Sequence, residues 1–262
     1  MNTDLSSRQA LVCGGSAGIG LACAIELAAL GASVTLVARR AEALSQCARE
    51  LPTPAGQRHD WLALDLSDPG SARAGVESRV RAGARYHILV NNTGGPPEGT
   101  ALQNSAEEYA GAFRAHLLTP QALVHALVPG MREAGYGRIV NVLSTSVKAP
   151  IPTLAISNTI RAGVAAWAKS LSIELGPHQI TVNNVLPGFT ATDRLRDLQR
   201  EWSMKQGITE EELRARHLAT IPMRRFGEAS EIGAAVAFLC TPAASYISGI
   251  NLPVDGGRTP TL

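Results

Sequence analysis

Short apolar segments alternate with longer amphipathic segments along most of the chain. The longer segments carry apolar side chains at helical spacing, for example at 19–30 and 154–175. Strands that alternate with helices predict right-handed βαβ units, in which all strands are parallel and helices cover both faces of the sheet. The predicted fold class is α/β, a doubly wound parallel sheet of about seven strands, at 10–13, 34–38, 61–64, 88–90, 139–143, 180–186 and 250–254.

No internal repeat or linker interrupts this alternation, so residues 1–262 are predicted to form a single domain. A long helical stretch is predicted at 105–134, with starts or kinks at Pro120 and Pro129. The segment at 193–217 is highly charged and lies between the sixth strand and the last helix. It is either a solvated helical excursion or a lid over a ligand cleft, at about 190–225, and its position after a strand favours the lid.

Composition narrows the classes of partner. Hydrophobic residues make up 45% of the chain and charged residues 18%, with a formal net charge of +2 and scattered basic residues. No basic stripe indicates a nucleic-acid partner, and no apolar run approaches the roughly 18 residues that would span a bilayer. The N-terminus lacks the pattern of a secretory signal, and the four cysteines have no metal-ligand spacing. We expect a reduced cytoplasmic protein without a metal site, a nucleic-acid partner or a membrane partner.

Three glycines follow the first predicted strand and precede the first helix, at Gly14, Gly18 and Gly20. Glycines at this spacing allow a tight turn that brings backbone N–H groups close to a pyrophosphate, and the helix N-terminus behind them favours negative charge. The strand before and the helix after are the context that this motif needs. The sequence therefore predicts a Rossmann-type dinucleotide-binding domain. The expected contacts in this loop are Gly14, Ser16, Ala17, Gly18, Ile19 and Gly20.

The end of the second predicted strand indicates which dinucleotide is bound. An acid at this point would hydrogen-bond the ribose hydroxyls of NAD, whereas a basic group accommodates the extra phosphate of NADP. The chain has Ala38 at this point, followed by Arg39 and Arg40. The two arginines could simply be surface residues, but a guanidinium matches a phosphate with paired hydrogen bonds. NADP(H) is the predicted cofactor.

These motifs resemble those of the short-chain dehydrogenase/reductase family. The glycine loop matches the family pattern GxxxGxG, Asp65-Leu66 matches the sign after the third strand, and Asn91-Asn92-Thr93-Gly94 matches the turn after the fourth. The turn from Pro187 to Thr192 and the C-terminal Val254-Asp255-Gly256-Gly257 complete the series over nearly the whole chain. The further cofactor contacts that the resemblance implies are Asp65, Leu66, Asn91, Thr93, Gly94, Pro187, Gly188, Thr190 and Thr192.

The catalytic positions depart from the family pattern. The resemblance implies a serine, a tyrosine thirteen residues later, a lysine four residues after that, and an asparagine in the long middle helix. This chain has Ser144, Ser157, Arg161 and His116 at these positions, so only the serine is retained.

The replacements change the acid–base chemistry. A positioned general acid contributes about 10²–10⁴-fold to a rate, and serine is a much weaker acid than tyrosine. Arg161 would stay protonated, so it could hold the ribose or stabilise an anion but could not relay a proton. His116 could supply a proton near neutral pH, or it could only take the structural place of the asparagine, which is the more common role of a lone helical histidine.

Three functions follow from these residues. The first is an NADPH-dependent reductase of a ketone or 3-oxoacyl thioester, resembling the 3-oxoacyl-carrier-protein reductases of the family. In it, Ser144 and Ser157 would hold the carbonyl oxygen, and His116 or water would deliver the proton. The second is a catalytically impaired NADP(H)-binding protein that acts as a partner subunit or redox sensor. A non-redox reaction ranks last. The resemblance also implies a homotetramer or homodimer formed through the two long helices.

Overall fold

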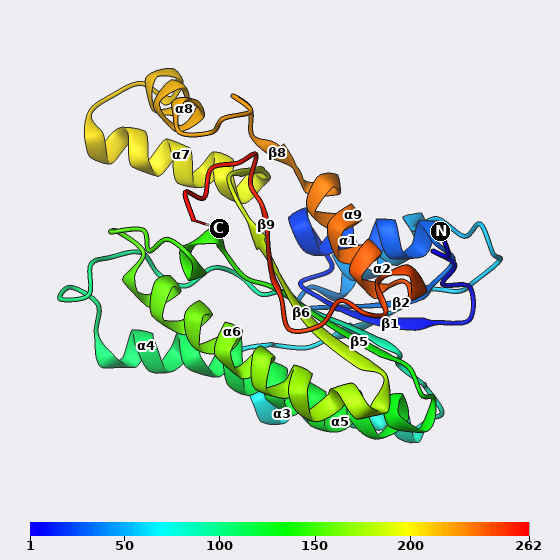
Figure 1. Cartoon of the computed structure of the whole chain (residues 1–262). Coiled ribbons are helices and arrows are strands. Elements are labelled where there is room, and N and C mark those ends of the chain that lie inside the picture. The colour runs from blue at the N-terminus through cyan, green and yellow to red at the C-terminus, as the bar shows by residue number, and fades with distance from the viewer. Residues whose placement is uncertain (262) are drawn as a thin grey trace.

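A seven-stranded parallel sheet forms the centre of the molecule in the computed structural model, which describes residues 1–261 (Figure 1). Its strand order is β3-β2-β1-β4-β5-β6-β9, and every neighbouring pair is parallel. The predicted doubly wound α/β fold of about seven strands is confirmed. The strands are β1 Gln9–Cys13, β2 Ser33–Ala38, β3 Asp60–Ala63, β4 Ile88–Asn91, β5 Gly137–Val142, β6 Ile180–Pro187 and β9 Asn251–Val254.

Helices cover both faces of the sheet (Figure 1). One face is covered by α1 (Gly18–Ala29), α2 (Ala41–Glu50) and α9 (Ala229–Cys240). The other is covered by α3 (Pro69–Arg81), α4 (Ala106–Phe113), α5 (Thr119–Glu133) and α6 (Ala155–Leu175). Short 3-10 turns lie at Thr145–Val147, Gly176–His178 and Pro242–Ala244.

Alternate residues of β1, an inner strand of the sheet, pack into two separate cores. Ala10 and Val12 of β1 face the core formed with α1 and α9, whereas Leu11 and Cys13 face the core formed with α5 and α6. Because side chains alternate across a strand, a strand covered on both faces favours apolar residues at successive positions. This is why the strands appear in the sequence as continuous apolar runs.

The predicted helix at 105–134 is one helical path with a π-helical turn in it. This turn, Arg114–Leu118, joins α4 to α5. Pro120 lies at the start of α5, directly after the π turn, and Pro129 lies inside α5. The π turn carries His116, whose side chain is buried.

A row of four asparagines crosses the sheet. Asn91 donates from Nδ2 to Asn141 Oδ1, Asn141 donates to Asn184, and Asn184 donates to Asn251, each at 2.8 Å. The four residues are register partners in β4, β5, β6 and β9. Each of these amides donates to the next, whereas Asn91 Oδ1 is buried without a partner among residues 1–261. The row holds the strands in register beneath the cleft described below.

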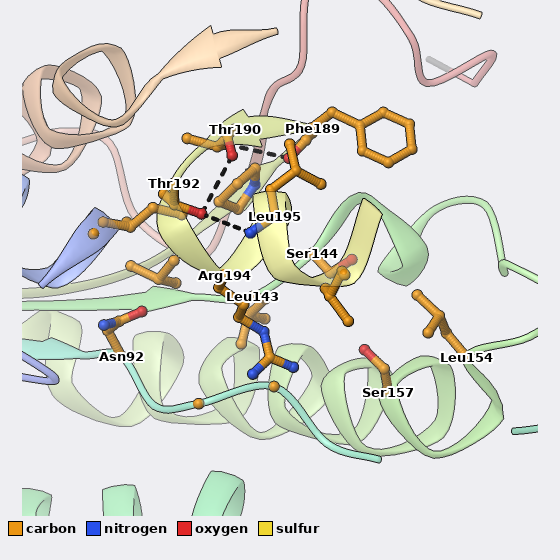
Figure 2. A pocket seen from close by; sticks show the side chains of 18 of the residues that line it. Asn92, Leu143, Ser144, Leu154, Ser157, Phe189, Thr190, Thr192, Arg194 and Leu195 are labelled. Atoms are coloured by element: carbon orange, nitrogen blue, oxygen red, sulfur yellow. Dashed lines mark hydrogen bonds between the residues drawn. The ribbon is translucent and has the colours of Figure 1, made fainter. Parts of the chain in front are cut away.

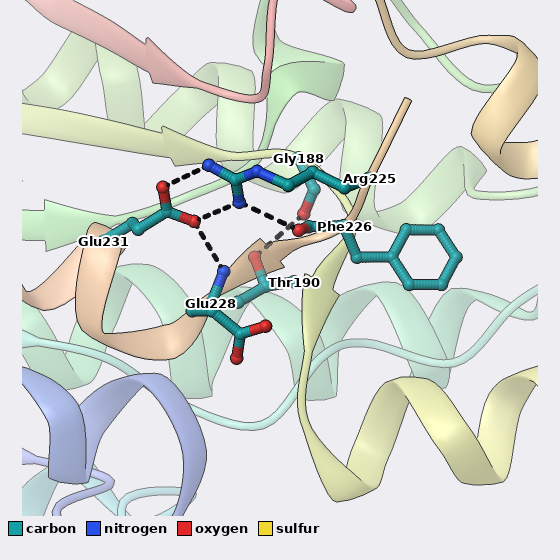
Figure 3. A network of polar contacts seen from close by, with 6 residues as sticks. All are labelled: Gly188, Thr190, Arg225, Phe226, Glu228 and Glu231. Carbon is teal, nitrogen blue, oxygen red and sulfur yellow. Dashed lines mark hydrogen bonds and ion pairs between the residues drawn. The ribbon is translucent and has the colours of Figure 1, made fainter. Parts of the chain in front are cut away.

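The charged segment after β6 forms two helices, α7 (Asp193–Gln206) and α8 (Glu210–Ala219). The short strands β7 (Thr190–Ala191) and β8 (Gly227–Glu228) pair in parallel and close this excursion at its base. Arg225 donates two hydrogen bonds of 2.6 Å to the Glu231 carboxylate, which also accepts the Glu228 N–H at 2.8 Å (Figure 3). The arginine holds the pKa of Glu231 down at about 2. This base therefore ties the excursion to the turn after β6.

Candidate active site

The strand order reverses at β1 and β4, and a cleft lies at the carboxyl ends of these two strands. Such a switch point is where open α/β sheets bind ligands. Two adjoining cavities, with volumes of about 480 and 820 Å³, occupy the cleft. Their walls share Gly14, Thr93, Gly94, Gly95 and Pro96. We call them the first and the second cavity.

The glycine loop has the shape that a pyrophosphate needs. Gly14 has φ of +63°, and a Cβ there would be 2.5 Å from Asn92 Nδ2. A Cβ on Gly20 would overlap the carbonyl oxygen of Gly14. The residue that precedes α1, Ala17, provides no side-chain cap, so the first N–H groups of the helix remain available to an anion. These residues fit the phosphates of a dinucleotide.

The second cavity contains the residues predicted to choose the cofactor. Arg39 and Arg40 are exposed on its wall, beside Asp65 and Leu66. The Ser67 backbone N–H lowers the pKa of Asp65, and the charge of Arg39 contributes to the same shift. An acceptor carboxylate and two guanidinium groups suit an adenosine that carries a phosphate. The cavity therefore fits the adenosine end of NADP(H).

The first cavity brings together three of the four predicted catalytic residues. Ser144 follows β5, and Ser157 and Arg161 lie on α6 one turn apart. Figure 2 shows Ser157 reaching up from α6 towards Ser144. Pro187, Gly188 and the residues after them form the opposite side. The wall also contains the predicted cofactor residues Gly14, Ala17, Gly18, Ile19, Thr93, Gly94, Pro187, Gly188, Thr190 and Thr192.

Arg161 is 9% exposed and carries an incompletely satisfied guanidinium. One Nη donates to the carbonyl oxygens of Val142, at 3.0 Å, and Leu143, at 2.6 Å. Its Nε has no hydrogen-bond partner among residues 1–261. Burial, with a smaller contribution from the nearby charge of Arg194, lowers the pKa of Arg161 to about 10. Arg161 is therefore protonated at neutral pH and supplies fixed positive charge to the cavity.

His116 lines the second cavity, apart from the two serines. Its Nδ1 lies 2.9 Å from Thr93 Oγ1. Burial lowers the pKa of His116 to about 3, with a contribution from the charge of Arg161. The imidazole is therefore neutral at pH 7. This geometry supports the structural role for His116 more than proton delivery.

Two predicted cofactor residues do not line either cavity, and several residues that do line the first cavity were not predicted. Gly20 and Asn91 support the cleft from outside the two cavity walls, Asn91 through the asparagine row. Glu98, Arg194, Trp202 and Arg258 line the first cavity, although no motif indicated them. The only signal for Arg194 was its position two residues after Thr192, at the start of the charged segment.

No helix within residues 1–261 has the length and apolar character needed to cross a membrane. In the same part of the chain, no cluster of three or more His, Cys, Asp or Glu side chains is arranged to hold a metal ion.

Comparison with known proteins gives consistent matches over the whole chain. A family model described as enoyl-(acyl carrier protein) reductase matches residues 14–259. The NADPH-dependent reductase BacG of Bacillus subtilis is 30% identical over 260 residues, covering 98% of this chain and 100% of that protein. The 3-oxoacyl-[acyl-carrier-protein] reductase FabG of Pseudomonas aeruginosa is 33% identical over 255 residues, covering 97% and 98%. The structure of L-sorbose reductase from Gluconobacter frateurii, complexed with NADPH and L-sorbose, has a TM-score of 0.93 at 31% identity over 100% of both chains.

The chain belongs to the short-chain dehydrogenase/reductase family. Within it, the protein is an NADP(H)-dependent oxidoreductase, as the glycine loop and the arginines after β2 predict. The alternative of a catalytically impaired NADP(H)-binding protein finds no support in these matches.

Proposed function

We propose that the protein reduces the carbonyl group of a ketone or 3-oxoacyl thioester in the first cavity, with Ser157 and Arg161 in place of the usual tyrosine and lysine. The observation that carries this proposal is the convergence of Ser144, Ser157 and Arg161 on one cavity beside the Pro187-Gly188 turn. The names of the relatives support it, because one is a 3-oxoacyl reductase and another reduces L-sorbose.

In this proposal Ser144 and Ser157 donate hydrogen bonds to the carbonyl oxygen. Bound NADPH supplies the hydride. Negative charge then develops on the oxygen, and the positive charge of Arg161 stabilises it in a water-poor site. The proton comes from water, because a serine hydroxyl is a poor acid and His116 lies on the other cavity with its pKa held near 3.

The excursion at about 190–225 is proposed to act as a lid. Leu195, Leu198 and Trp202 of α7 contribute to the wall of the first cavity. The His217 ring from α8 stacks on Phe189 at 4.5 Å between centroids and meets Trp202 edge-on at 5.6 Å. These contacts join both helices to the turn that borders the site. Closure over bound ligands would exclude water from the reaction.

The proposed assembly is a homotetramer or homodimer formed through α5 and α6. Apolar side chains near these helices are exposed, namely Phe113 at 43%, Leu118 at 39% and Ile173 at 71%. Exposed apolar groups of this kind favour an interface.

The test is NADPH oxidation with acetoacetyl-coenzyme A and with a panel of uncharged ketones. Ser144→Ala is expected to lower kcat about 10–100-fold, because a donor to the developing oxyanion is lost. Ser170→Ala is the matched control, since Ser170 lies on α6 with its hydroxyl bonded to Ala166 O and does not line the first cavity. No NADPH oxidation with any carbonyl, or equal effects of the two substitutions, would contradict the proposal.

A further inference from the structure

Three arginines and two acids line the first cavity: Arg161, Arg194, Arg258, Glu98 and Asp193. The excess of arginines over acids does not by itself show that the cavity is positively charged, because each charge can be neutralised by a neighbour. The partners of the groups therefore decide which charges remain available. Arg258 donates from Nε to Thr220 Oγ1 at 3.3 Å and lies over the Phe189 ring at 4.7 Å.

Both acids are already engaged by other groups. The Glu98 carboxylate accepts hydrogen bonds from Trp202 Nε1 at 2.8 and 2.9 Å and lies 3.8 Å from Lys205 Nζ. The Asp193 side chain is 86% exposed and pairs with Arg196. Neither carboxylate pairs with an arginine of the cavity.

Arg194 has no such partner. Its side chain makes no ion pair and no hydrogen bond with any residue that the structure describes. Figure 2 shows it reaching from the start of α7 across the cavity. The guanidinium lies against Gly95, where a Cβ would be only 2.5 Å from an Nη atom. The first turn of α7 adds the positive end of a helix dipole beside it.

The positively charged Arg161 also faces the first cavity. Its Nε is buried and without a partner in residues 1–261, as described above. The charge of Arg194 lowers the pKa values of both Arg161 and His116, which places the three groups within electrostatic reach of one another. Two unneutralised guanidinium groups that converge in one cavity form a binding site for an anion.

We infer that the substrate carries an anionic group, a carboxylate or a phosphate, near its carbonyl, and that Arg194 binds this group while Arg161 adds positive charge. This inference rests on the proposed function, because the carbonyl is placed by Ser144 and Ser157. Apolar side chains, among them Leu154 and Leu198, line another part of the wall. The preferred substrate is thus a ketone that carries a carboxylate or phosphate group and a short apolar end.

The inference is tested by binding, which needs no turnover. Complexes of the protein with NADP⁺ are titrated by calorimetry with acetoacetate, with 2-oxopropylphosphonate, and with the uncharged acetoacetamide. A charge-assisted pair in a partly enclosed site predicts that the anions bind at least about ten-fold more tightly than the amide. A preference for one anion over the other identifies the carboxylate or the phosphate as the natural group.

Arg194→Gln is the decisive variant, because it removes the charge and keeps a polar side chain. It is expected to weaken binding of the anions about ten-fold or more and to leave the acetoacetamide Kd within about two-fold. Arg200→Gln is the control. Arg200 lies on the same helix, pairs with Glu210 at 3.6 Å and does not line the cavity.

Two results would overturn the inference. One is that the wild-type complex binds the anions no more tightly than the amide, or binds none of the three. The other is that Arg194→Gln weakens NADP⁺ binding and leaves the preference for anions intact, since Arg194 would then serve the cofactor phosphates. Failure of the proposed function is separate: the anions would bind preferentially, yet NADPH would not be oxidised in their presence.

Discussion

An arginine at position 161, where the family pattern has a lysine, changes the chemistry that the site can support. A lysine at this place would present a compact and titratable charge, whereas the guanidinium stays protonated and forms directional bonds. Here it bonds the carbonyl oxygens of Val142 and Leu143 at the end of β5. The charge therefore has a fixed place beside the serines. Fixed charge suits the stabilisation of an oxyanion and does not suit the transfer of a proton.

Arg39 is predicted to select NADPH over NADH. Arg39→Ala should raise the Kd for NADPH about ten-fold or more and leave the Kd for NADH within about two-fold, because only NADPH has the phosphate that the guanidinium binds. Calorimetry with both dinucleotides measures this. Arg49→Ala is the control, as Arg49 lies on α2 and bonds Ser45 and Gln46 outside the second cavity. An unchanged NADPH affinity would refute the role.

His116 is predicted to make the protein sensitive to acid. Its pKa is about 3 in the folded protein, against an ordinary value of 6.5. Between these values the unfolded chain binds more protons at this residue, so the free energy of unfolding falls as the pH drops from 6.5 towards 3. The full contribution is present above pH 6.5. The slope from one such group reaches at most about 1.4 kcal/mol per pH unit.

Urea unfolding between pH 7.5 and 5 measures this slope. His116→Asn should flatten it, whereas the exposed His125→Asn on α5 should leave it unchanged. Equal slopes for the wild type and His116→Asn would mean that His116 is not held neutral. A loss of activity near neutral pH that disappears in His116→Asn would instead restore its role in proton delivery.

At the scale of elements, the excursion of α7 and α8 depends on its base more than on its own helices. The helices are polar, with few buried residues, and each contributes only a small apolar surface. The base has the β7–β8 pairing and the Arg225–Glu231 ion pair. A segment with few buried contacts opens locally more easily than a strand of the sheet.

Loss of the ion pair at the base is predicted to loosen the excursion. Arg225→Ala should increase cleavage by chymotrypsin within 193–226 by no more than about five-fold, because a solvent-exposed ion pair contributes only modestly to stability. Mass spectrometry of the fragments locates the cuts. Arg73→Ala, which removes the exposed pair with Glu77 on α3, should not change the rate. Equal cleavage of wild type and Arg225→Ala would show that the pair does not restrain the excursion.

At the scale of the whole molecule, the proposed assembly predicts a mass in solution well above 27.5 kDa, the mass of one chain. Light scattering should find two or four chains per particle. Ile173→Glu should shift the protein towards smaller particles, since it places a charge on an exposed apolar position of α6. Leu102→Glu, at a fully exposed residue in the loop before α4, is the control. A monomeric wild type would exclude the assembly.

The order of strands and helices, the glycine loop and the cofactor type could be derived from the sequence because each depends on local pattern. Apolar runs such as 10–13 record burial on both faces of a sheet. Gly14 and Gly20 lie where a Cβ would collide with neighbouring atoms, and Gly18 has a φ of +53°, which side chains disfavour. The departures at Ser157 and Arg161 stay a prediction from the sequence, made because these residues fall at numbered places in the family pattern.

Only the tertiary structure decided which of these residues act together. Topology places Ser144, Ser157 and Arg161 on one cavity and His116 on the other, and burial lowers the pKa of His116 well below neutrality. It also joins four asparagines from four strands and brings Arg194 across the cleft to Gly95. Such contacts link residues that are far apart in the chain. Burial, charge and hydrogen bonding depend on those three-dimensional neighbours, which no local spacing encodes.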